Sequence, residues 1–172
     1  MAKGGKTQIV LDADVVIHFA KGGRLSQLPS IFPEYEYVLL ETVYEELKSL
    51  RSQVDNQIMR LKNITLQPFA PRGEMLREYA VLKSRFGKGE SACMAYCLFT
   101  HNVIGSSNLR DIRAYCKENK ITYLTTMDFL WYAWRKQMLT TDEVKTFMNE
   151  VRSKGSKLRE VDIEKYVCTT IL

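Results

Sequence analysis

Two carboxylates follow the first apolar segment of the chain. Asp12 and Asp14 come directly after residues 9–11, in the sequence IVLDAD. The three apolar residues suit a buried strand, whereas acidic side chains are costly to bury unless they are paired or bind a metal. The two acids therefore indicate a chemical site at the end of a strand.

Three further acids occupy unusual places. Glu46 lies one helical turn from Val43, Glu90 opens the small-residue segment GESACMAYC, and Asp111 follows SSN at the start of a predicted helix. Taken singly, each is better explained as a solvated charge or as an acid at a helix N-terminus. Their meaning depends on whether the fold brings them to Asp12.

The elements that would position these acids alternate between strands and helices. Strands are predicted at residues 9–11, 35–40, 64–66, 102–105 and 121–124. Helices are predicted at residues 15–20, 42–50 with Thr42 as cap, 58–61, 74–86, 90–98, 109–119, 128–138 and 141–151. This alternation predicts an α/β three-layer sandwich, with a central, mostly parallel sheet flanked by helices. Ligands of such sheets bind at the carboxyl ends of the strands, where Asp12 and Asn108 are expected.

Composition limits the class of protein. The chain has 172 residues, of which 45% are hydrophobic and 26% charged, which predicts one globular domain over residues 1–172. Residues 1–7 are expected to be a flexible tail, and residues 126–172 a helical C-terminal extension. No apolar stretch approaches a membrane span, and no signal peptide is recognised. We therefore expect no membrane partner. The four cysteines form no CxxC pair, so we expect reduced thiols in a cytoplasmic protein.

The net charge of +5 is spread along the chain rather than gathered in a block. It is compatible with a phosphate-bearing partner, and equally with an ordinary solvated surface.

Four segments, taken in order, resemble the PIN domain, the fold of VapC-like toxin ribonucleases and of several RNA-processing nucleases. They are IVLDADVVI, VYEELKSL, GKGESACMAYC and VIGSSNLRDIRAYC. The resemblance covers residues 9–121 and leaves the C-terminal helices outside its motifs. It implies a metal-dependent endoribonuclease that cleaves single-stranded RNA with Mg²⁺ or Mn²⁺. It also implies RNA as a partner and, for a toxin, an antitoxin protein. The aromatic residues of the C-terminal region are expected to lie mostly in the core, with a homodimer or partner surface as the alternative.

The resemblance assigns roles by position. The implied catalytic residues are Asp12, Glu46, Glu90 and Asn108. The implied metal ligands are Asp12, Glu90, Asn108, Asp14 and Asp111, and the implied substrate-binding residues are Ser106, Ser107, Arg110 and Lys88. Clustered carboxylates repel one another, and a divalent cation offsets that repulsion, activates a water and neutralises charge on the phosphate.

Asn108 departs from the pattern, because the family usually has Asp there. An amide oxygen can bind a hard cation but brings no charge. Asp14 or Asp111 could restore the charge. The alternative is a catalytically weak PIN-like module that binds RNA or protein.

A second alternative comes from another enzyme class. A strand followed by Asp-x-Asp is also the signature of haloacid-dehalogenase-like phosphatases, in which Asp12 would be the nucleophile and Asp14 the general acid. That class also needs a Lys and a late acidic pair at a strand end. The segment SSNLRD and the lone Asp128 match this requirement poorly.

Overall fold

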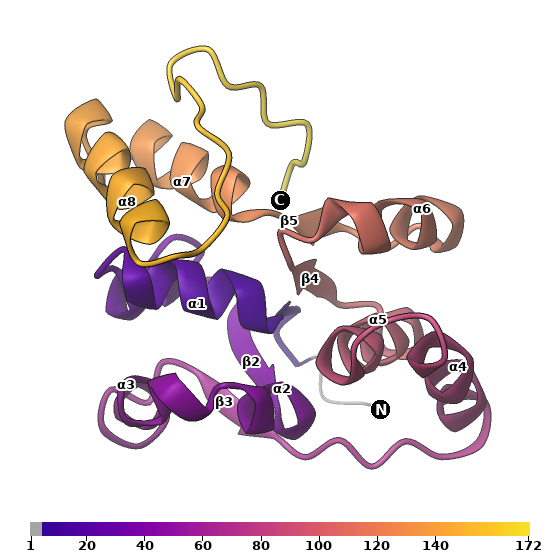
Figure 1. Ribbon diagram of the computed structural model, residues 1–172. Coiled ribbons are helices and arrows are strands. Elements are labelled where there is room, and N and C mark those ends of the chain that lie inside the picture. The colour runs from indigo at the N-terminus through magenta and orange to yellow at the C-terminus, as the bar shows by residue number, and fades with distance from the viewer. Residues whose placement is uncertain (1–4) are drawn as a thin grey trace.

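A five-stranded parallel sheet forms the centre of the molecule. The computed structural model describes residues 5–172, so the first four residues of the predicted tail lie outside it. The strands are β1 (Gln8–Leu11), β2 (Glu36–Leu40), β3 (Thr65–Gln67), β4 (Val103–Gly105) and β5 (Tyr123–Leu124). Every strand pairing is parallel, and the order is β3-β2-β1-β4-β5 (Figure 1). The predicted mostly parallel sheet is confirmed.

Helices cover both faces of the sheet. They are α1 (Ala13–Lys21), α2 (Glu41–Glu46), α3 (Arg51–Asp55), α4 (Gly73–Lys83), α5 (Lys88–Thr100), α6 (Leu109–Asn119), α7 (Thr126–Arg135) and α8 (Thr141–Ser153). Short turns of other helix types are η1 (Leu25–Ser30), η2 (Lys48–Leu50) and η3 (Asn56–Arg60). Helices α1, α7 and α8 lie on one side, and α4, α5 and α6 on the other (Figure 1). The three-layer α/β sandwich is thus also confirmed.

The central strand explains where a site can form. Ile9, Val10 and Leu11 are fully buried, as expected of a parallel strand covered on both faces. Val10 pairs with Val38 of β2 on one side and with Ile104 of β4 on the other. The chain leaves β1 toward one edge and later returns to β4 on the opposite side. A crevice at the carboxyl ends of β1 and β4 is the usual binding place in such a sheet.

The segment after β2 differs from the single helix predicted over residues 42–50. Helix α2 begins at Glu41, directly after the strand, so Thr42 lies inside it and caps nothing. The helix ends at Glu46, because Leu47 leaves helical geometry with φ −91° and ψ 37°. Apolar spacing is nevertheless kept through η2, and Val43 and Leu47 are both buried. As a result, Glu46 is the last residue of a short helix.

Helices α7 and α8 pack against α1. Thr125 with Asp128, and Thr140 with Glu143, form capping boxes at their N-termini. The ring of Phe19 in α1 meets the rings of Phe129 and Phe147 edge-on. A Cβ atom at Gly22 would lie 2.3 Å from the Phe147 ring, so this close approach of α8 requires glycine.

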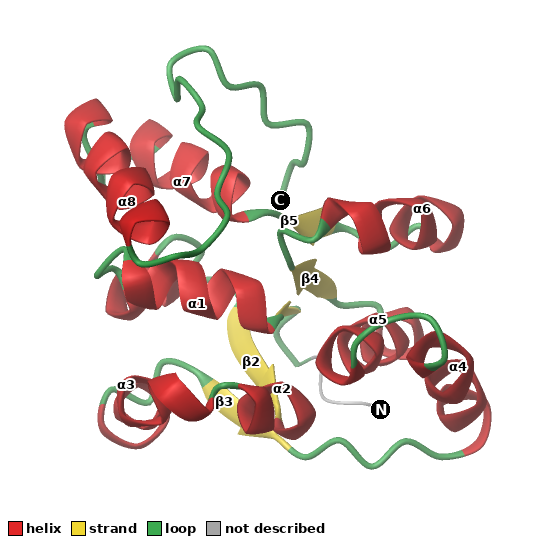
Figure 2. Cartoon of the chain, viewed as in Figure 1, coloured by secondary structure: helices red, strands yellow, loops and turns green. Residues whose placement is uncertain are grey.

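The last nineteen residues contain no helix. Of the predicted extension 126–172, residues 126–135 and 141–153 are helical. Residues 154–172, here called the C-terminal segment, loop back past α7 and end near β5 (Figure 2). The Tyr166 hydroxyl donates to Asp128 Oδ1 over 2.7 Å, and the Thr170 hydroxyl donates to the Tyr123 carbonyl over 3.0 Å. These bonds attach the segment to α7 and β5.

None of the helices within residues 5–172 is long and apolar enough to cross a membrane. All four cysteines are free thiols, and three of them, Cys93, Cys97 and Cys116, are buried.

Candidate active site

Asp12 lies at the carboxyl end of β1 and caps α1. Its Oδ1 accepts a 2.8 Å hydrogen bond from the Ala13 N–H, and its Oδ2 accepts a 3.1 Å bond from the Ser106 hydroxyl. The Asp12 N–H donates to the Gly105 carbonyl over 2.8 Å. Only 5% of the residue is exposed. Asp12 is therefore fixed in the crevice between β1 and β4.

Asp14 lies in the first turn of α1 and is held at the same crevice. Its Oδ1 accepts from the Val15 N–H over 2.7 Å, and its Oδ2 accepts from the Ser107 N–H over 2.8 Å. Ser106 and Ser107 follow β4 directly, so two consecutive serines hold the two acids.

Glu90 enters from α5, on the opposite layer. Helix α5 lies close to the sheet because its buried residues include glycine, serine and alanine. Glu90 is 8% exposed, and its Oε1 is enclosed without a hydrogen-bond partner among residues 5–172. Burial, and then the neighbouring carboxylates of Asp12 and Asp111, raise the pKa of Glu90 to about 8. An enclosed acceptor of this kind calls for a cation or a proton.

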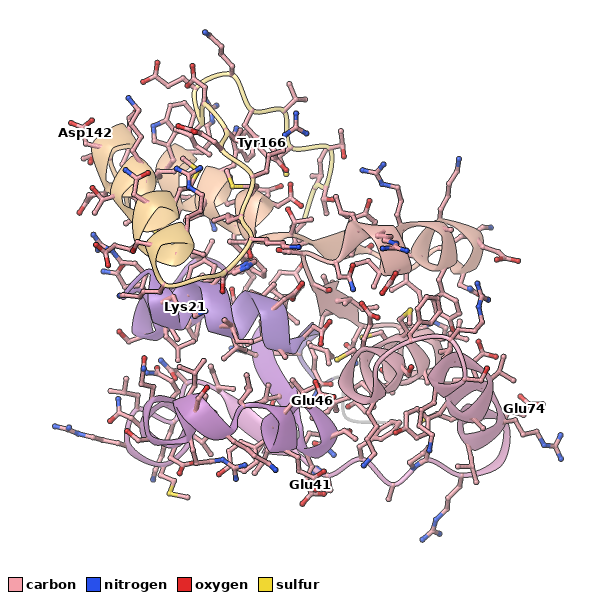
Figure 3. The ribbon with its side chains drawn as sticks, in the orientation of Figure 1. Lys21, Glu41, Glu46, Glu74, Asp142 and Tyr166 are labelled. Carbon is pink, nitrogen blue, oxygen red and sulfur yellow. The ribbon has the colours of Figure 1, made fainter. Side chains whose placement is uncertain are left out.

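Glu46 reaches the same place from the end of α2. Its Oε1 accepts a 2.8 Å hydrogen bond from the Gly89 N–H. Figure 3 shows Glu46 near the middle of the molecule, between α2 and the first turn of α5. A Cβ atom at position 89 would lie 2.8 Å from Glu46 Oε2, so the contact depends on glycine. Glu46 is exposed, in contrast to Asp12 and Glu90.

Asn108 binds Asp111. Its Nδ2 donates to Asp111 Oδ2 over 2.9 Å, and its backbone N–H donates to the Ser106 hydroxyl over 3.3 Å. Asp111 in turn is among the charges that raise the pKa of Glu90. Asn108 thus links the serines after β4 to the acid in the first turn of α6.

The electrostatics of this group are those of crowded like charges. Burial, and then the Asp14 carboxylate, raise the pKa of Asp12 to about 7. Burial raises the pKa of Asp14 to about 6, although hydrogen bonds from the Ser107 and Val15 backbones oppose it. The site is therefore short of positive charge, which a divalent cation would supply.

The donor atoms suit a hard cation such as Mg²⁺ or Mn²⁺, because all are carboxylate, amide or hydroxyl oxygens. Within residues 5–172, no three His, Cys, Asp or Glu side chains are already gathered as a metal-binding group. Asp12 is held by two hydrogen bonds, whereas Glu46 is exposed and Asp111 half-buried. Rotation of the Glu46 and Asp111 side chains could bring their carboxylates toward a bound cation. The oxygen donors of the site fit Mg²⁺ or Mn²⁺.

The predicted substrate-binding residues lie around the acids. Lys88, the first residue of α5, lines an open pocket of about 360 Å³ together with Glu46, Lys48 and Arg51. Arg110 is exposed in the first turn of α6, and no ion pair joins it to another described residue. The structure therefore brings all ten predicted site residues to one edge of the sheet, with Arg110 the least engaged.

Two residues at this edge of the sheet, His18 and Thr126, were not predicted from the sequence. The Ser107 hydroxyl donates to Thr126 Oγ1 over 2.7 Å, and His18 Nδ1 shares a 2.8 Å hydrogen bond with the same Thr126 oxygen. Burial, and then the Lys21 ammonium, lower the pKa of His18 to about 4. The available signals were the four-residue spacing of Asp14 and His18 on one helix and the position of Thr126 after β5.

Comparison with known families gives one result. A family model described as a PIN domain matches residues 8–167. The match includes every strand and helix and most of the C-terminal segment, whereas the four sequence motifs ended near residue 121. No curated protein sequence compared with the chain matches it.

Proposed function

Because the chain belongs to the PIN-domain family, whose fold is of the nuclease type, we propose that it hydrolyses single-stranded RNA with the help of Mg²⁺ or Mn²⁺. One observation carries the metal dependence. The Glu90 carboxylate is buried beside other acids, and its Oε1 has no hydrogen-bond partner among residues 5–172. A bound cation would satisfy that oxygen and offset the repulsion around it.

Asp12 and Glu90 would hold the ion, and Asp14, Glu46 and Asp111 would complete its negative surroundings. When bound, such an ion activates a water and neutralises charge on the scissile phosphate. The protein groups prepare this site. Ser106 and the backbone of Ser107 fix Asp12 and Asp14, so these two carboxylates need little rearrangement.

RNA as substrate is supported by the cations beside the acids. Lys48, Arg51 and Lys88 line the open pocket at Glu46. Phosphate groups bind such lysine and arginine side chains, and this electrostatic attraction accounts for much of nucleic-acid affinity. We place the sugar-phosphate backbone across this pocket.

The test is cleavage of a mixed RNA pool in Mn²⁺ and in EDTA, with Asp12→Asn as the variant and Asp142→Asn as the matched control. Asp142 is an exposed acid of α8, on the layer remote from α5 (Figure 3). We expect cleavage only in Mn²⁺, lost in Asp12→Asn and retained in Asp142→Asn. Equal and negligible cleavage in both buffers would contradict the proposal.

A binding module is the second candidate, and Asn108 favours it. The amide occupies a position where the family usually has an acid, and its nitrogen is engaged with Asp111. RNA binding in the absence of any Mn²⁺-dependent cleavage would support this candidate over the nuclease.

The position of Asp128 argues against the phosphatase alternative. Asp128, its late acid, accepts hydrogen bonds from the Thr125 N–H and hydroxyl in a capping box and from Tyr166. A carboxylate so engaged is structural.

A toxin role is a further part of the proposal and rests on the resemblance to VapC-like toxins. Induced expression in a bacterial host is its test. We expect growth arrest that Asp12→Asn relieves; unimpaired growth with the wild-type chain would argue against a toxin.

A further inference from the structure

A second cavity opens beside the acids. It has a volume of about 500 Å³ and lies between Ser107 and His18 on one side and the C-terminal segment on the other. This size is in the range of small-ligand sites. Ser107 belongs to both places, because it lines the cavity while its N–H donates to Asp14. A group in this cavity would be adjacent to the candidate active site.

The far wall of the cavity is held in place. Tyr166, labelled in Figure 3, lines the cavity, and its hydroxyl donates to Asp128 Oδ1 over 2.7 Å. Asp128 is 5% exposed and is itself fixed by Thr125. At the start of the segment, the Lys21 ammonium donates to the Ser156 hydroxyl over 2.8 Å. The cavity is therefore formed before any ligand arrives, which lowers the cost of binding.

The lining combines an apolar surface with unpaired cations. Leu109, Met127 and Leu158 contribute apolar side chains, and Tyr166 contributes an aromatic ring. Two acids also line the cavity, and both are paired: Asp162 with Lys165 at 3.4 Å and Glu160 with Arg152 at 3.6 Å. Lys157 and Arg159 are exposed at the rim, and no ion pair joins either to another residue of the described chain.

We propose that this cavity receives one unpaired nucleobase of the RNA strand, with Lys157 and Arg159 contacting the phosphates that flank it. The inference rests on the proposed function and adds to it a binding site for one base of the substrate. A flat, largely apolar base suits the Tyr166 side of the cavity, and its phosphates suit the cationic rim. Only a base that is free of a duplex can enter, so the cavity selects single-stranded RNA.

The experiment measures RNA binding without cleavage. Fluorescence anisotropy in EDTA compares a labelled single-stranded RNA of about eight nucleotides with versions that lack one base at each position in turn. We expect one abasic position to weaken binding at least about five-fold, the lower end for base stacking on an aromatic side chain. Equal affinity of all abasic versions would overturn the inference.

Variants of the chain locate the effect. Leu158→Trp places a larger side chain in the cavity and should reduce the penalty for the missing base, whereas Ile171→Trp, at a site 88% exposed, should leave that penalty unchanged. Lys157→Ala with Arg159→Ala should weaken binding of the intact RNA more than the charge-matched pair Arg60→Ala with Lys117→Ala, both exposed and outside the cavity. Equal losses in the two pairs would overturn the assignment of the rim. Should Leu158→Trp fail to fold, the two charge pairs still decide.

Cleavage in Mn²⁺ is assayed separately, so the two proposals can fail independently. Cleavage without any abasic effect overturns the base cavity and leaves the nuclease intact. An abasic effect at this cavity without cleavage supports the base cavity and overturns the nuclease.

Discussion

The carboxylate of Glu46 accepts a 2.8 Å hydrogen bond from the backbone N–H of Gly89, although the two residues are 43 positions apart in the chain. The bond joins the end of α2 to the first turn of α5. It places Glu46 next to Glu90, and it orients an exposed side chain that burial does not hold. The position of this candidate site carboxylate thus depends on the absence of a side chain at residue 89.

Gly89→Ala should lower Mn²⁺-dependent cleavage by about ten-fold or more, the usual effect of losing a group that orients a side chain beside a bound metal. The new Cβ atom would lie 2.8 Å from Glu46 Oε2, so the flexible Glu46 side chain must turn away. Stability of the metal-free protein should hold or rise by up to about 1 kcal/mol, because alanine is the better helix former. Cleavage rates and urea unfolding in EDTA measure both.

Gly87→Ala is the matched control. Nothing lies within 4 Å of a Cβ atom built there, and its φ of −60° is open to alanine. It should retain wild-type cleavage. Equal losses in the two variants would show that the effect is not specific to the Glu46 contact.

The sheet and most of its helices could be predicted from the sequence, because the spacing of apolar residues and the residues that begin or end an element are local signals. The apolar run 9–11 ends in an acid, and Gly87 precedes α5. The end of α2 at Glu46 could not be predicted, because the apolar spacing of Val43, Leu47 and Leu50 continues through a turn of different geometry.

At the site, residue types could be predicted, but side-chain partners could not. Nothing in the segment SSNLRD says that the Asn108 amide binds Asp111. The four-residue spacing places His18 on the same helix face as Asp14, but nothing in the sequence indicates its hydroxyl partner Thr126, 108 positions away. The cavity behind it is formed by the C-terminal segment, whose path depends on tertiary bonds such as that from Tyr166 to Asp128.

Asp12→Asn should abolish cleavage while leaving the fold intact. The asparagine oxygen can still accept from the Ala13 N–H, and its NH₂ group can donate to the Ser106 hydroxyl oxygen. The N-terminal cap of α1 is therefore retained. In EDTA at pH 8.5 the melting temperature should hold or rise, because a charged carboxylate with a pKa of about 7 is removed from a crowded site. At pH 5.5 the difference should be small, because Asp12 is already protonated. A large loss of stability at both pH values would identify Asp12 as a structural acid.

The stability of the metal-free protein should fall as the pH rises from 6.5 to 8.5. The raised pKa values of Asp12, about 7, and Glu90, about 8, mean that the folded state binds more protons than the unfolded state in this window. His18 acts in the opposite direction only below its ordinary pKa, since its folded-state pKa of about 4 makes acid destabilising there. Melting temperatures in EDTA measure the slope.

Mn²⁺ should reverse that trend. Cation binding requires deprotonated carboxylates. The rise in melting temperature caused by Mn²⁺ at about 1 mM, the concentration range in which weak hard-cation sites bind, should therefore grow between pH 6.5 and 8.5. Glu90→Gln should reduce both the slope in EDTA and the gain with Mn²⁺. A gain that is independent of pH would place the ion away from these acids.

Asn108→Asp tests the departure from the family pattern. In the wild-type chain the Asn108 amide nitrogen donates to Asp111 Oδ2 over 2.9 Å. A carboxylate at position 108 would instead repel the Asp111 carboxylate. The melting temperature in EDTA at pH 8.5 should therefore fall. The added charge should strengthen Mn²⁺ binding, because affinity for hard cations rises with ligand charge, and cleavage should be kept or raised. Isothermal titration with Mn²⁺ compares the two proteins, with Asn149→Asp on exposed α8 as the control. Lower stability with unchanged Mn²⁺ affinity would mean that position 108 orients Asp111 and lies outside the coordination of the ion.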